Sequence, residues 1–287
     1  RFWRYIIAAF QTVDERIGAR VMDVLAQPSL PTPEAWLPLL LNDLADAQST
    51  VLVLDDYHSI HNPAIHQSIY YFLQHLPPGV QLALLGRADP PLPLARMRVQ
   101  EELLELRGTD LRFTPDEVEQ YLNESMSLGL SAEDVALLTR RTEGWPAGVQ
   151  LAAQSLRGYE PDGRAAFIRS FSGSDRYVIN YLMEEVLQQQ PPELRHFLLC
   201  TSILTRLSAP LCATVSDQPE AKASWALHHL DDEHLFIIPL DAVGHWYRYH
   251  ALFAESLQTQ LRESDPELWN ELHRRASDWC ARNGHVE

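Results

Sequence analysis

Lysine is almost absent from this sequence of 287 residues: Lys222 is the only one, and every other basic residue of the 23 is an arginine. A phosphate-binding loop of the G-x-x-x-x-G-K-[ST] type needs a lysine directly after a glycine-rich turn. Lys222 lies in the segment Ala221-Lys222-Ala223-Ser224, which has no glycine near it. The chain therefore contains no such phosphate-binding loop.

Cysteine and long apolar runs are also scarce. The three cysteines, Cys200, Cys212 and Cys280, are too few and too scattered for a disulfide framework or a cysteine-type zinc site. No apolar run approaches the roughly 20 residues of a membrane helix, and no signal-peptide pattern opens the chain. We therefore expect a cytoplasmic protein that has no membrane partner.

The charge balance is acidic. The chain has 39 Asp and Glu residues against 23 Lys and Arg residues, which gives a net charge of −16. This balance disfavours direct binding to nucleic acid or to an anionic membrane, because both carry negative charge themselves. Hydrophobic residues make up 46% of the chain and charged residues 22%, as in ordinary globular proteins, and the length predicts about two domains.

The first third of the chain has a strand–helix–strand pattern. Apolar residues at helical spacing predict one long helix over residues 2–26. The unbroken apolar run Val51–Leu54 predicts a strand buried on both faces, and Val80–Leu85 predicts a second one. Asn62-Pro63 opens the helix between them. These elements predict a parallel α/β sheet, to which Glu101–Arg107 is expected to add a further strand.

After Gly108 the pattern becomes helical. Thr114-Pro115 and Ser131 are helix starts, and further helices follow with few strand signals. The strand-like segments Leu235–Ile238 and Trp246–Tyr249 then form a predicted hairpin set among short helices. That arrangement is typical of a winged helix. The fold class expected is thus α/β plus all-α.

Two charged positions follow the predicted strands directly. Asp55-Asp56 ends the first strand and Gly86-Arg87 ends the second. Ligands gather at the carboxyl ends of parallel strands, where acids can hold Mg²⁺ and orient a water molecule, and where an arginine can reach a phosphate. On the residues alone, a pair of solvated acids is an equally open interpretation of Asp55-Asp56, and a solvated surface arginine is the favoured interpretation of Arg87.

Two further positions lie in the helical part. Glu143-Gly144-Trp145-Pro146 joins two helices, and its simplest interpretation is a glycine at the end of one helix and a proline in the first turn of the next. His250 opens the helix that follows Trp246–Tyr249. Free backbone N–H groups at such a helix start favour an anion, although a lone histidine there is more often structural or solvated.

These segments together carry a resemblance. They are Phe2-Trp3-Arg4-Tyr5, Asp55-Asp56-Tyr57-His58, Arg87–Arg96, Leu106–Thr114, Thr142-Glu143-Gly144-Trp145 and Trp246-Tyr247-Arg248-Tyr249-His250. In this order they resemble the MalT-type large ATP-binding regulators of the LuxR class, which are STAND signal-transduction ATPases. The resemblance runs over nearly the whole chain.

The resemblance implies a domain layout. Residues 1–108 would be the C-terminal part of a P-loop NTPase sheet, 109–158 a helical domain with a GxP motif, and 159–262 a winged helix. Residues 263–287 would begin a helical arm or sensor. The Walker A segment would precede Arg1, and the sensor repeats and the LuxR-type DNA-binding domain would follow Glu287. The chain is therefore expected to be an internal fragment of a longer regulator.

The resemblance also implies roles for single residues. Asp55 would be the Walker B ligand of Mg²⁺ and Asp56 the acid that polarises a catalytic water. Arg87 would sense the γ-phosphate of ATP. Gly144 and Pro146 match the GxP motif, whose proline packs on adenine, and His250 would touch the β-phosphate of ADP.

The function implied is an ATP/ADP switch in an inducer-responsive bacterial transcriptional activator. The inducer, a small molecule or a protein, and the DNA would bind outside this chain, the ATP-bound form would self-assemble, and any ATPase activity would be slow and regulatory. Without the phosphate-binding loop, nucleotide binding by the fragment alone is expected to be weak. Two alternatives stay open: a P-loop ATPase that acts on its own substrate, and a stand-alone protein-interaction module.

Overall fold

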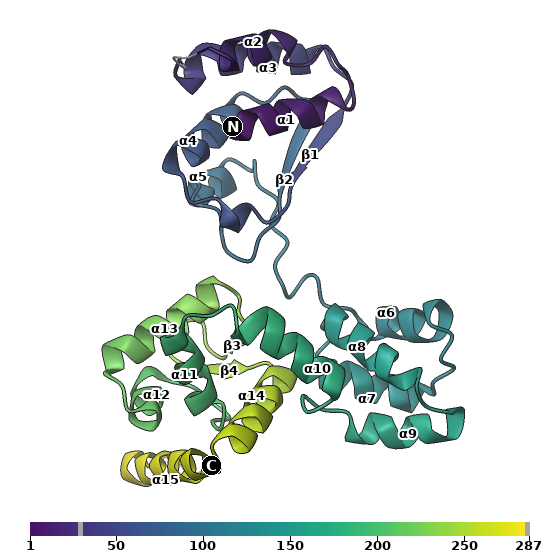
Figure 1. Cartoon of the computed structure of the whole chain (residues 1–287), viewed down its shortest axis with the longest axis vertical. Coiled ribbons are helices and arrows are strands. Elements are labelled where there is room, and N and C mark those ends of the chain that lie inside the picture. Colours follow the sequence, from purple (N-terminus) through teal and green to yellow (C-terminus); the bar gives the residue numbers. More distant parts are fainter. Residues whose placement is uncertain (28–30, 285–287) are drawn as a thin grey trace. The chain divides into compact units, whose positions relative to one another are not determined.

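The computed structural model describes residues 1–27 and 31–284 of the chain, and it is mostly helical (Figure 1). It separates into two compact units, residues 1–104 and residues 105–287. Each unit has its own hydrophobic core. Within the described residues, no helix is both long enough and apolar enough to cross a membrane.

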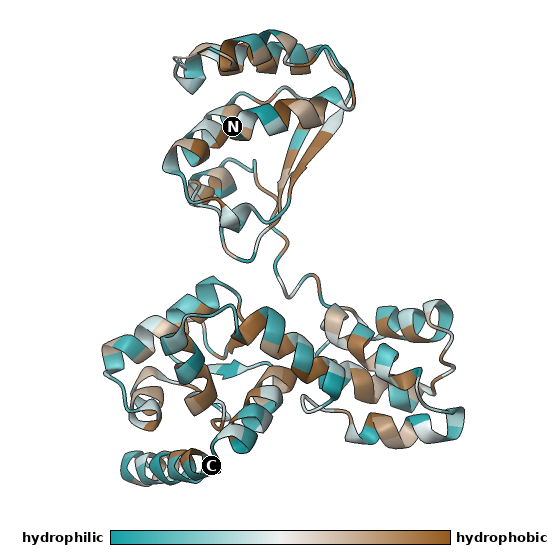
Figure 2. Cartoon of the chain, in the orientation of Figure 1, coloured by the Kyte–Doolittle hydropathy of each residue, from teal (hydrophilic) through white to brown (hydrophobic). Residues whose placement is uncertain are grey.

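The first unit is built on two parallel strands. β1 (Thr50–Leu54) and β2 (Val80–Leu84) pair residue by residue over their whole length, and α4 (Pro63–Gln74) connects them. Figure 2 shows the apolar residues along both strands. The Asn62 side chain accepts a hydrogen bond from the Ala64 N–H and thereby caps α4. The predicted strand–helix–strand unit is confirmed.

Helices cover one face of this small sheet. The other helical elements of the unit are α1 (Phe2–Gln11), α2 (Ala19–Leu25), α3 (Pro33–Ala45), a 3₁₀ turn η1 (Tyr57–Ser59) and α5 (Leu94–Val99). Trp3 contacts Trp36 and Phe72 edge-on, with ring centroids 5.6 and 5.3 Å away, and its indole N–H donates to the Ser68 hydroxyl. These contacts tie α1, α3 and α4 into one core.

The single helix predicted over residues 2–26 is wrong, because the chain turns between α1 and α2. Gly18 lies just before α2 with φ +70°, a left-handed conformation that interrupts a helix. Its N–H donates to the carboxylate of Asp43, and a Cβ atom at this position would lie 2.7 Å from the Ile7 side chain. The close packing of the turn on α1 and α3 therefore overrides the continuous helical pattern of the sequence.

The prediction that β1 is buried on both faces is also wrong. Leu52 is buried, but Val51 and Val53 are 57% and 55% exposed. The helices pack on one face of the sheet only, and alternate residues of a strand point to opposite faces. An unbroken apolar run therefore marked the strand correctly but overstated its burial.

The third strand predicted at Glu101–Arg107 is wrong as well, since these residues adopt no regular structure. Glu101 has a left-handed φ of +59°, and Leu104 is 85% exposed. An extended segment becomes a strand only where a neighbouring strand accepts its hydrogen bonds. The sheet of this unit consists of β1 and β2 within the described residues.

The second unit begins with a group of short helices. They are α6 (Pro115–Glu119), a π-helical turn η2 (Gln120–Ser125), α7 (Ala132–Thr142), α8 (Pro146–Leu156) and α9 (Pro161–Ser170). Thr114 and Glu117 form a reciprocal capping box at the start of α6, and the Ser131 hydroxyl accepts the Asp134 N–H at the start of α7. Both predicted helix starts are confirmed, whereas α9 was not predicted.

The rest of the second unit contains the predicted winged helix. Its elements are α10 (Arg176–Tyr181), a π-helical turn η3 (Leu182–Leu187), α11 (Pro192–Thr201), α12 (Ala209–Ser216), α13 (Glu220–Asp232), β3 (Ile237–Pro239), β4 (Tyr247–Tyr249), α14 (Ala251–Ser264) and α15 (Pro266–Asn283). β3 and β4 are antiparallel, which confirms the predicted hairpin.

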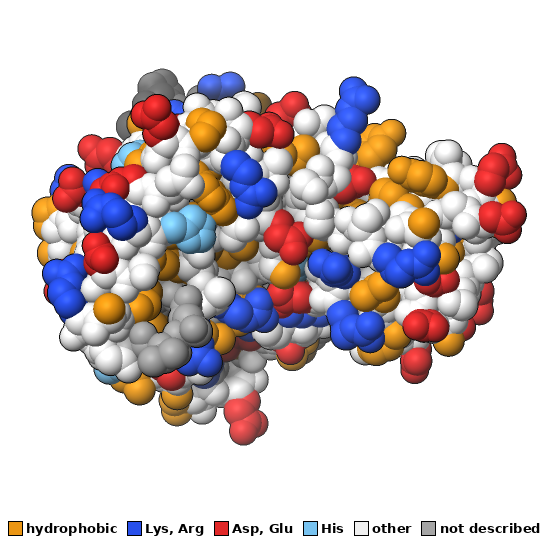
Figure 3. Space-filling model, turned by 90° about the horizontal axis from the view of Figure 1, so that it is seen from below, with side chains coloured by type: hydrophobic (Ala, Val, Ile, Leu, Met, Phe, Trp, Pro, Cys, Tyr) orange, Lys and Arg blue, Asp and Glu red, His pale blue; other side chains and the backbone are white. Residues whose placement is uncertain are grey.

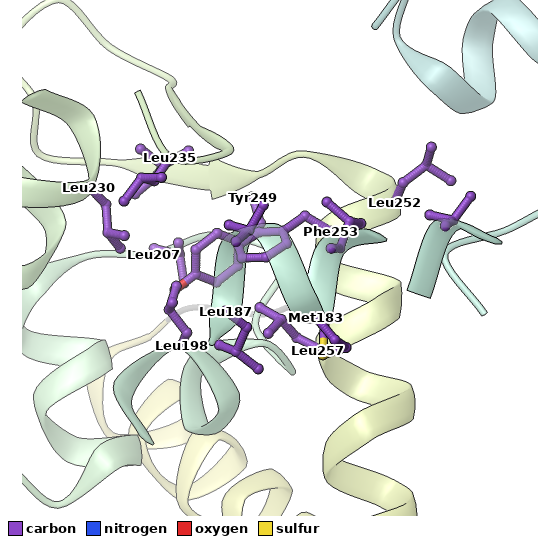
Figure 4. Close-up of a cluster of buried hydrophobic side chains, with 14 of the residues drawn as sticks. Met183, Leu187, Leu198, Leu207, Leu230, Leu235, Tyr249, Leu252, Phe253 and Leu257 are labelled. Carbon is purple, nitrogen blue, oxygen red and sulfur yellow. The ribbon is translucent and has the colours of Figure 1, made fainter. Parts of the chain in front are cut away.

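The core of the winged helix lies beneath this hairpin. Figure 4 shows Tyr249 and Phe253 side by side within a cluster of leucines from several helices. The hydroxyl of Tyr249, which is buried, lies 2.8 Å from the Thr201 hydroxyl of α11. Strand β4 and the start of α14 are therefore held rigidly by the core, and the next residue along the chain from Tyr249 is His250.

Candidate functional site

The first group of candidate residues lies at the carboxyl ends of β1 and β2. Asp55 and Asp56 follow β1, and Arg87 follows β2; all three side chains are exposed. Because the two strands are parallel, both ends meet at one edge of the sheet. The Leu85 N–H donates to the Leu54 carbonyl at 2.9 Å, which extends the pairing into the loops that carry these residues.

His58 connects the two loops. Its Nδ1 lies 3.9 Å from Oδ1 of Asp56 and 3.5 Å from the backbone nitrogen of Arg87. Asp56 itself has a left-handed φ of +51°, an uncommon conformation for a residue other than glycine. The structure thus brings Asp55, Asp56 and Arg87 to one edge, as the sequence predicts.

Tyr57 anchors the turn after the acid pair. Its side chain is buried, its hydroxyl lies 2.9 Å from Nδ1 of His66 in α4, and burial raises its pKa to about 12. The Tyr57 N–H also donates to the Leu85 carbonyl. Tyr57 is therefore fixed in the core, while the carboxylates of Asp55 and Asp56 directly before it lie at the surface.

The chemistry of this edge suits a hard cation. Mg²⁺ is usually bound by one or two carboxylates together with water and phosphate oxygens. Asp55 and Asp56 can supply such carboxylates, and no group of three or more metal-binding side chains occurs in the described part of the chain. The donor set therefore fits an ion that a phosphorylated ligand shares and does not fit an all-protein metal cage.

The second group of candidate residues lies in the turn between α7 and α8. Glu143 and Gly144 are both left-handed, with φ +49° and +71°, and Pro146 opens α8 at its first turn. The Gly144 carbonyl accepts the Phe113 N–H at 2.8 Å, and a Cβ atom on Gly144 would lie 2.5 Å from the Phe113 carbonyl. Only glycine fits this position, so the predicted helix–glycine–proline turn is confirmed.

His250 is the N-cap residue of α14 and is 4% exposed. Its Nε2 lies 3.0 Å from the Thr142 carbonyl, and its ring meets Trp145 and Phe236 edge-on. Burial is the main reason why its pKa lies below the ordinary value of 6.5, and the charges of Arg112 and Arg248 add to that effect. The structure therefore joins His250 to the turn that holds Gly144 and Pro146.

Only one of the two ring nitrogens of His250 has a hydrogen-bond partner. A carbonyl only accepts, so Nε2 carries the proton, and Nδ1 of the neutral ring keeps its lone pair. Nδ1 is buried and has no hydrogen-bond partner. A buried polar atom without a partner costs free energy, and such atoms are uncommon enough to mark places where a ligand or a proton is expected.

Sequence reasoning missed the role of Glu143. Its Oε1 accepts from Arg248 Nη1 at 2.8 Å and from the Ala251 N–H at 3.1 Å, and its Oε2 accepts from Arg248 Nη2 at 2.8 Å and Arg112 Nη1 at 3.4 Å. Burial alone would raise the pKa of Glu143, but the bonds from Arg248 and Ala251 and the nearby His250 lower it to about 2. No local pattern could reveal these contacts, because Arg248 and Ala251 lie more than 100 residues away.

Known proteins that are similar to this chain include transcriptional regulators. Residues 183–269 match the family described as the MalT winged helix domain. The chain is 31% identical over 284 residues to the HTH-type transcriptional regulator MalT of Klebsiella pneumoniae, and 29% identical over 279 residues to that of Vibrio cholerae. These alignments cover 98% and 96% of the chain.

A different kind of relative is similar over the same region. The chain is 30% identical over 287 residues to the serine/threonine-protein kinase PknK of Mycobacterium tuberculosis, of which it covers 25%. It spans 31% of the length of the MalT relatives. The chain is thus similar to the MalT-type regulators over nearly its whole length, as its resemblance to them indicates, and its residues 183–269 match the MalT winged helix domain.

Proposed function

We propose that this chain is the nucleotide-switch core of an inducer-responsive bacterial transcriptional activator. The observation that carries the proposal is the similarity to MalT, a transcriptional regulator, along 98% of the chain. The similarity to PknK supports a switch in particular, because regions similar to this chain occur in proteins named for two different outputs. A nucleotide-dependent conformational change can serve either output.

In this proposal β1 and β2 belong to a larger P-loop sheet. The strand-end geometry supports it: Asp55 would hold Mg²⁺, Asp56 would polarise an attacking water, and Arg87 would contact the γ-phosphate of ATP. The exposed carboxylates and the neighbouring arginine are the residue types that such a ligand needs. The chain itself has no phosphate-binding loop, so tight binding is proposed for the longer protein.

In the second unit, Gly144, Pro146 and His250 are the proposed nucleotide contacts. The unpartnered Nδ1 of His250 supports this, because a phosphate that approaches the ring favours protonation of that nitrogen and then accepts its N–H. When bound, ATP and Mg²⁺ would supply the γ-phosphate chemistry. His250 and the α7–α8 turn only recognise and orient the nucleotide, and any hydrolysis is slow and regulatory.

The decisive experiment compares His250→Ala with His245→Ala in the complete regulator. His245 lies in the same hairpin region and is exposed, so it serves as the matched control. We expect His250→Ala to weaken ADP binding by about ten- to a hundred-fold, since a charge-assisted hydrogen bond contributes roughly 1.5–3 kcal/mol. Basal, inducer-independent transcription should rise as the ADP-bound state is lost.

A purely structural histidine gives a different result. His250→Ala would then lower the thermal stability while ADP affinity and basal transcription stay at the level of His245→Ala. That outcome would contradict the proposed nucleotide contact.

A further inference from the structure

The start of α14 carries the hydrogen-bond donors that an anion site needs. Four donor groups converge there: two N–H groups of the Arg248 guanidinium, one of Arg112, and the backbone N–H of Ala251. A helix N-terminus favours negative charge, and guanidinium groups match the planar or tetrahedral oxygens of carboxylates and phosphates. All four donors point at one group, the Glu143 carboxylate.

A second observation at the same place is independent of Glu143. His250, the residue directly before α14, is 4% exposed and has an Nδ1 atom without a partner. The ring is held by the Thr142 carbonyl on its other nitrogen, so it cannot turn without losing that bond. A buried polar atom that the protein leaves unpaired therefore belongs to the residue at the start of α14.

We propose that Glu143 is an internal plug, whose carboxylate occupies a phosphate site formed by Arg112, Arg248 and the N-terminus of α14. A phosphorylated ligand binds there by displacing that carboxylate. In the switch this ligand is the diphosphate part of the nucleotide, and to that extent the inference rests on the proposed function. The competition itself does not, because inorganic pyrophosphate offers the same oxygens.

The competition follows from charge and geometry. A carboxylate and a phosphate need the same N–H donors, and two anions held by one set of donors repel each other. Glu143 is attached to the site by the chain, so its effective concentration there is high and free anions are excluded. The Glu143 side chain is only 14% exposed, which shows how fully it fills the position.

Backbone strain makes the plug displaceable. Glu143 has a left-handed φ of +49°, which costs free energy in a residue with a Cβ atom. Such a conformation persists only while its contacts hold it. When a ligand takes over the donors, the α7–α8 turn loses the Glu143 bonds that join it to β4 and α14, and Glu143 can leave the strained conformation. Displacement thus weakens the attachment of this turn to the winged helix, which the His250–Thr142 bond still maintains.

The test measures the affinity of the chain for pyrophosphate by calorimetry at low ionic strength. Glu143→Gln keeps the size of the side chain and removes its charge, so we expect at least tenfold tighter binding than in the wild type. Glu271→Gln is the matched control, because Glu271 also pairs with two arginines, Arg274 and Arg275, within α15. It should bind as weakly as the wild type.

A second substitution locates the binding. Adding Arg248→Gln to Glu143→Gln should remove the gain, since it takes away two of the four donors. If circular dichroism shows that Glu143→Gln is unfolded, Glu143→Asp replaces it, because the shorter side chain withdraws the carboxylate from the site. Binding of pyrophosphate to the Glu143 variant no tighter than to Glu271→Gln would overturn the proposal.

The same measurements separate this inference from the proposed function. If the complete regulator fails to bind ADP while Glu143→Gln gains pyrophosphate affinity, the nucleotide proposal fails and the plug stands. If the regulator binds ADP and Glu143→Gln gains nothing, the plug fails and the switch stands.

Discussion

Glu143 and Arg248 form a two-pronged ion pair, in which each carboxylate oxygen accepts one guanidinium N–H at 2.8 Å. The two residues are 105 positions apart, one in the turn before α8 and the other in β4. The Glu143 side chain is 14% exposed and that of Arg248 is 35% exposed, so the pair lies at the edge of the core. The turn and the hairpin therefore depend on each other for their conformation.

Replacing Glu143 by alanine should destabilise the second unit by about 2 kcal/mol. The change leaves a half-buried arginine and the Ala251 N–H without their acceptor, and bonds to charged groups contribute roughly 1.5–3 kcal/mol. Urea denaturation followed by circular dichroism measures the loss. Glu271→Ala removes an acid that is more exposed than Glu143 and whose ion pairs lie within the single helix α15, so it is expected to change the stability by less than about 0.5 kcal/mol. Equal losses in both variants would contradict the structural role of Glu143.

Gly144→Ala should cost about 3 kcal/mol, and Gly129→Ala about 1 kcal/mol. Both glycines have a positive φ, +71° and +63°, so alanine pays a conformational cost at either position. Only at Gly144 does the new Cβ atom also meet an obstacle, the Phe113 carbonyl at 2.5 Å, whereas nothing lies within 4 Å at Gly129. Thermal unfolding of both variants checks the difference, and a Gly129 variant as unstable as the Gly144 variant would refute it.

Much of the fold can be predicted from local patterns. Both parallel strands, the capped helix between them, and the helix starts at Thr114 and Ser131 depend on short-range signals, and the structure confirms them. The predictions that proved wrong concern places where long-range packing decides the structure. The chain turns at Gly18, which packs closely on Ile7, and the segment after Glu101 pairs with no strand in the described part of the chain. A sequence pattern records neither kind of contact.

Some residues of the candidate site could likewise be predicted from local patterns, and others could not. Asp55, Asp56 and Arg87 could be found because strand ends are visible in the sequence, and parallel pairing then brings them to one edge. Glu143 could not be singled out, because its partners come from distant segments. The sequence motif does contain it, directly before Gly144, but nothing local distinguishes its carboxylate from that of an exposed acid.

The stability of the second unit should fall on acidification because of His250. Its pKa in the folded chain lies below 6.5, so the unfolded chain binds the proton more readily. The stabilisation is present in full above pH 6.5 and is lost as the pH falls through the folded-state pKa. The charged groups that face the ring are Glu143, which opposes this shift, and Arg112 and Arg248, which add to it.

The variant His250→Gln isolates this effect. A glutamine amide can still donate to the Thr142 carbonyl but does not titrate. The free energy of unfolding, measured in urea at about pH 7.5 and about pH 5.5, should fall more in the wild type than in the variant. Parallel losses in the two proteins would show that His250 does not contribute to the pH dependence.

Tyr57→Phe should destabilise the first unit by about 1 kcal/mol. The substitution keeps the buried ring but removes the hydroxyl that pairs with Nδ1 of His66, which is itself buried. Tyr70→Phe is the control, because the Tyr70 hydroxyl accepts a hydrogen bond from Gln74 at the exposed side of α4. Denaturation in urea should show the larger loss for Tyr57→Phe, and a loss no larger than that of Tyr70→Phe would contradict the anchoring role of Tyr57.

The winged helix of this chain should not bind DNA specifically. In DNA-binding winged helices the helix before the hairpin supplies basic side chains to the groove, and phosphate contacts provide most of the affinity. Here that helix is α13, whose exposed residues include Glu220, Trp225 and Asp232, with Lys222 as its single basic side chain apart from histidines. On the face seen in Figure 3, acidic side chains lie among the basic ones.

The whole-chain charge of −16 adds long-range repulsion from the duplex. Electrophoretic mobility measurements at physiological salt should therefore show no shift of a duplex at sub-micromolar protein. A charge-reversed variant, Glu220→Lys with Asp232→Lys, serves as the control for the assay, because it places three lysines on α13 and should gain salt-sensitive, non-specific binding. A sequence-dependent shift by the unchanged chain would contradict the prediction and assign the winged helix a role in DNA recognition.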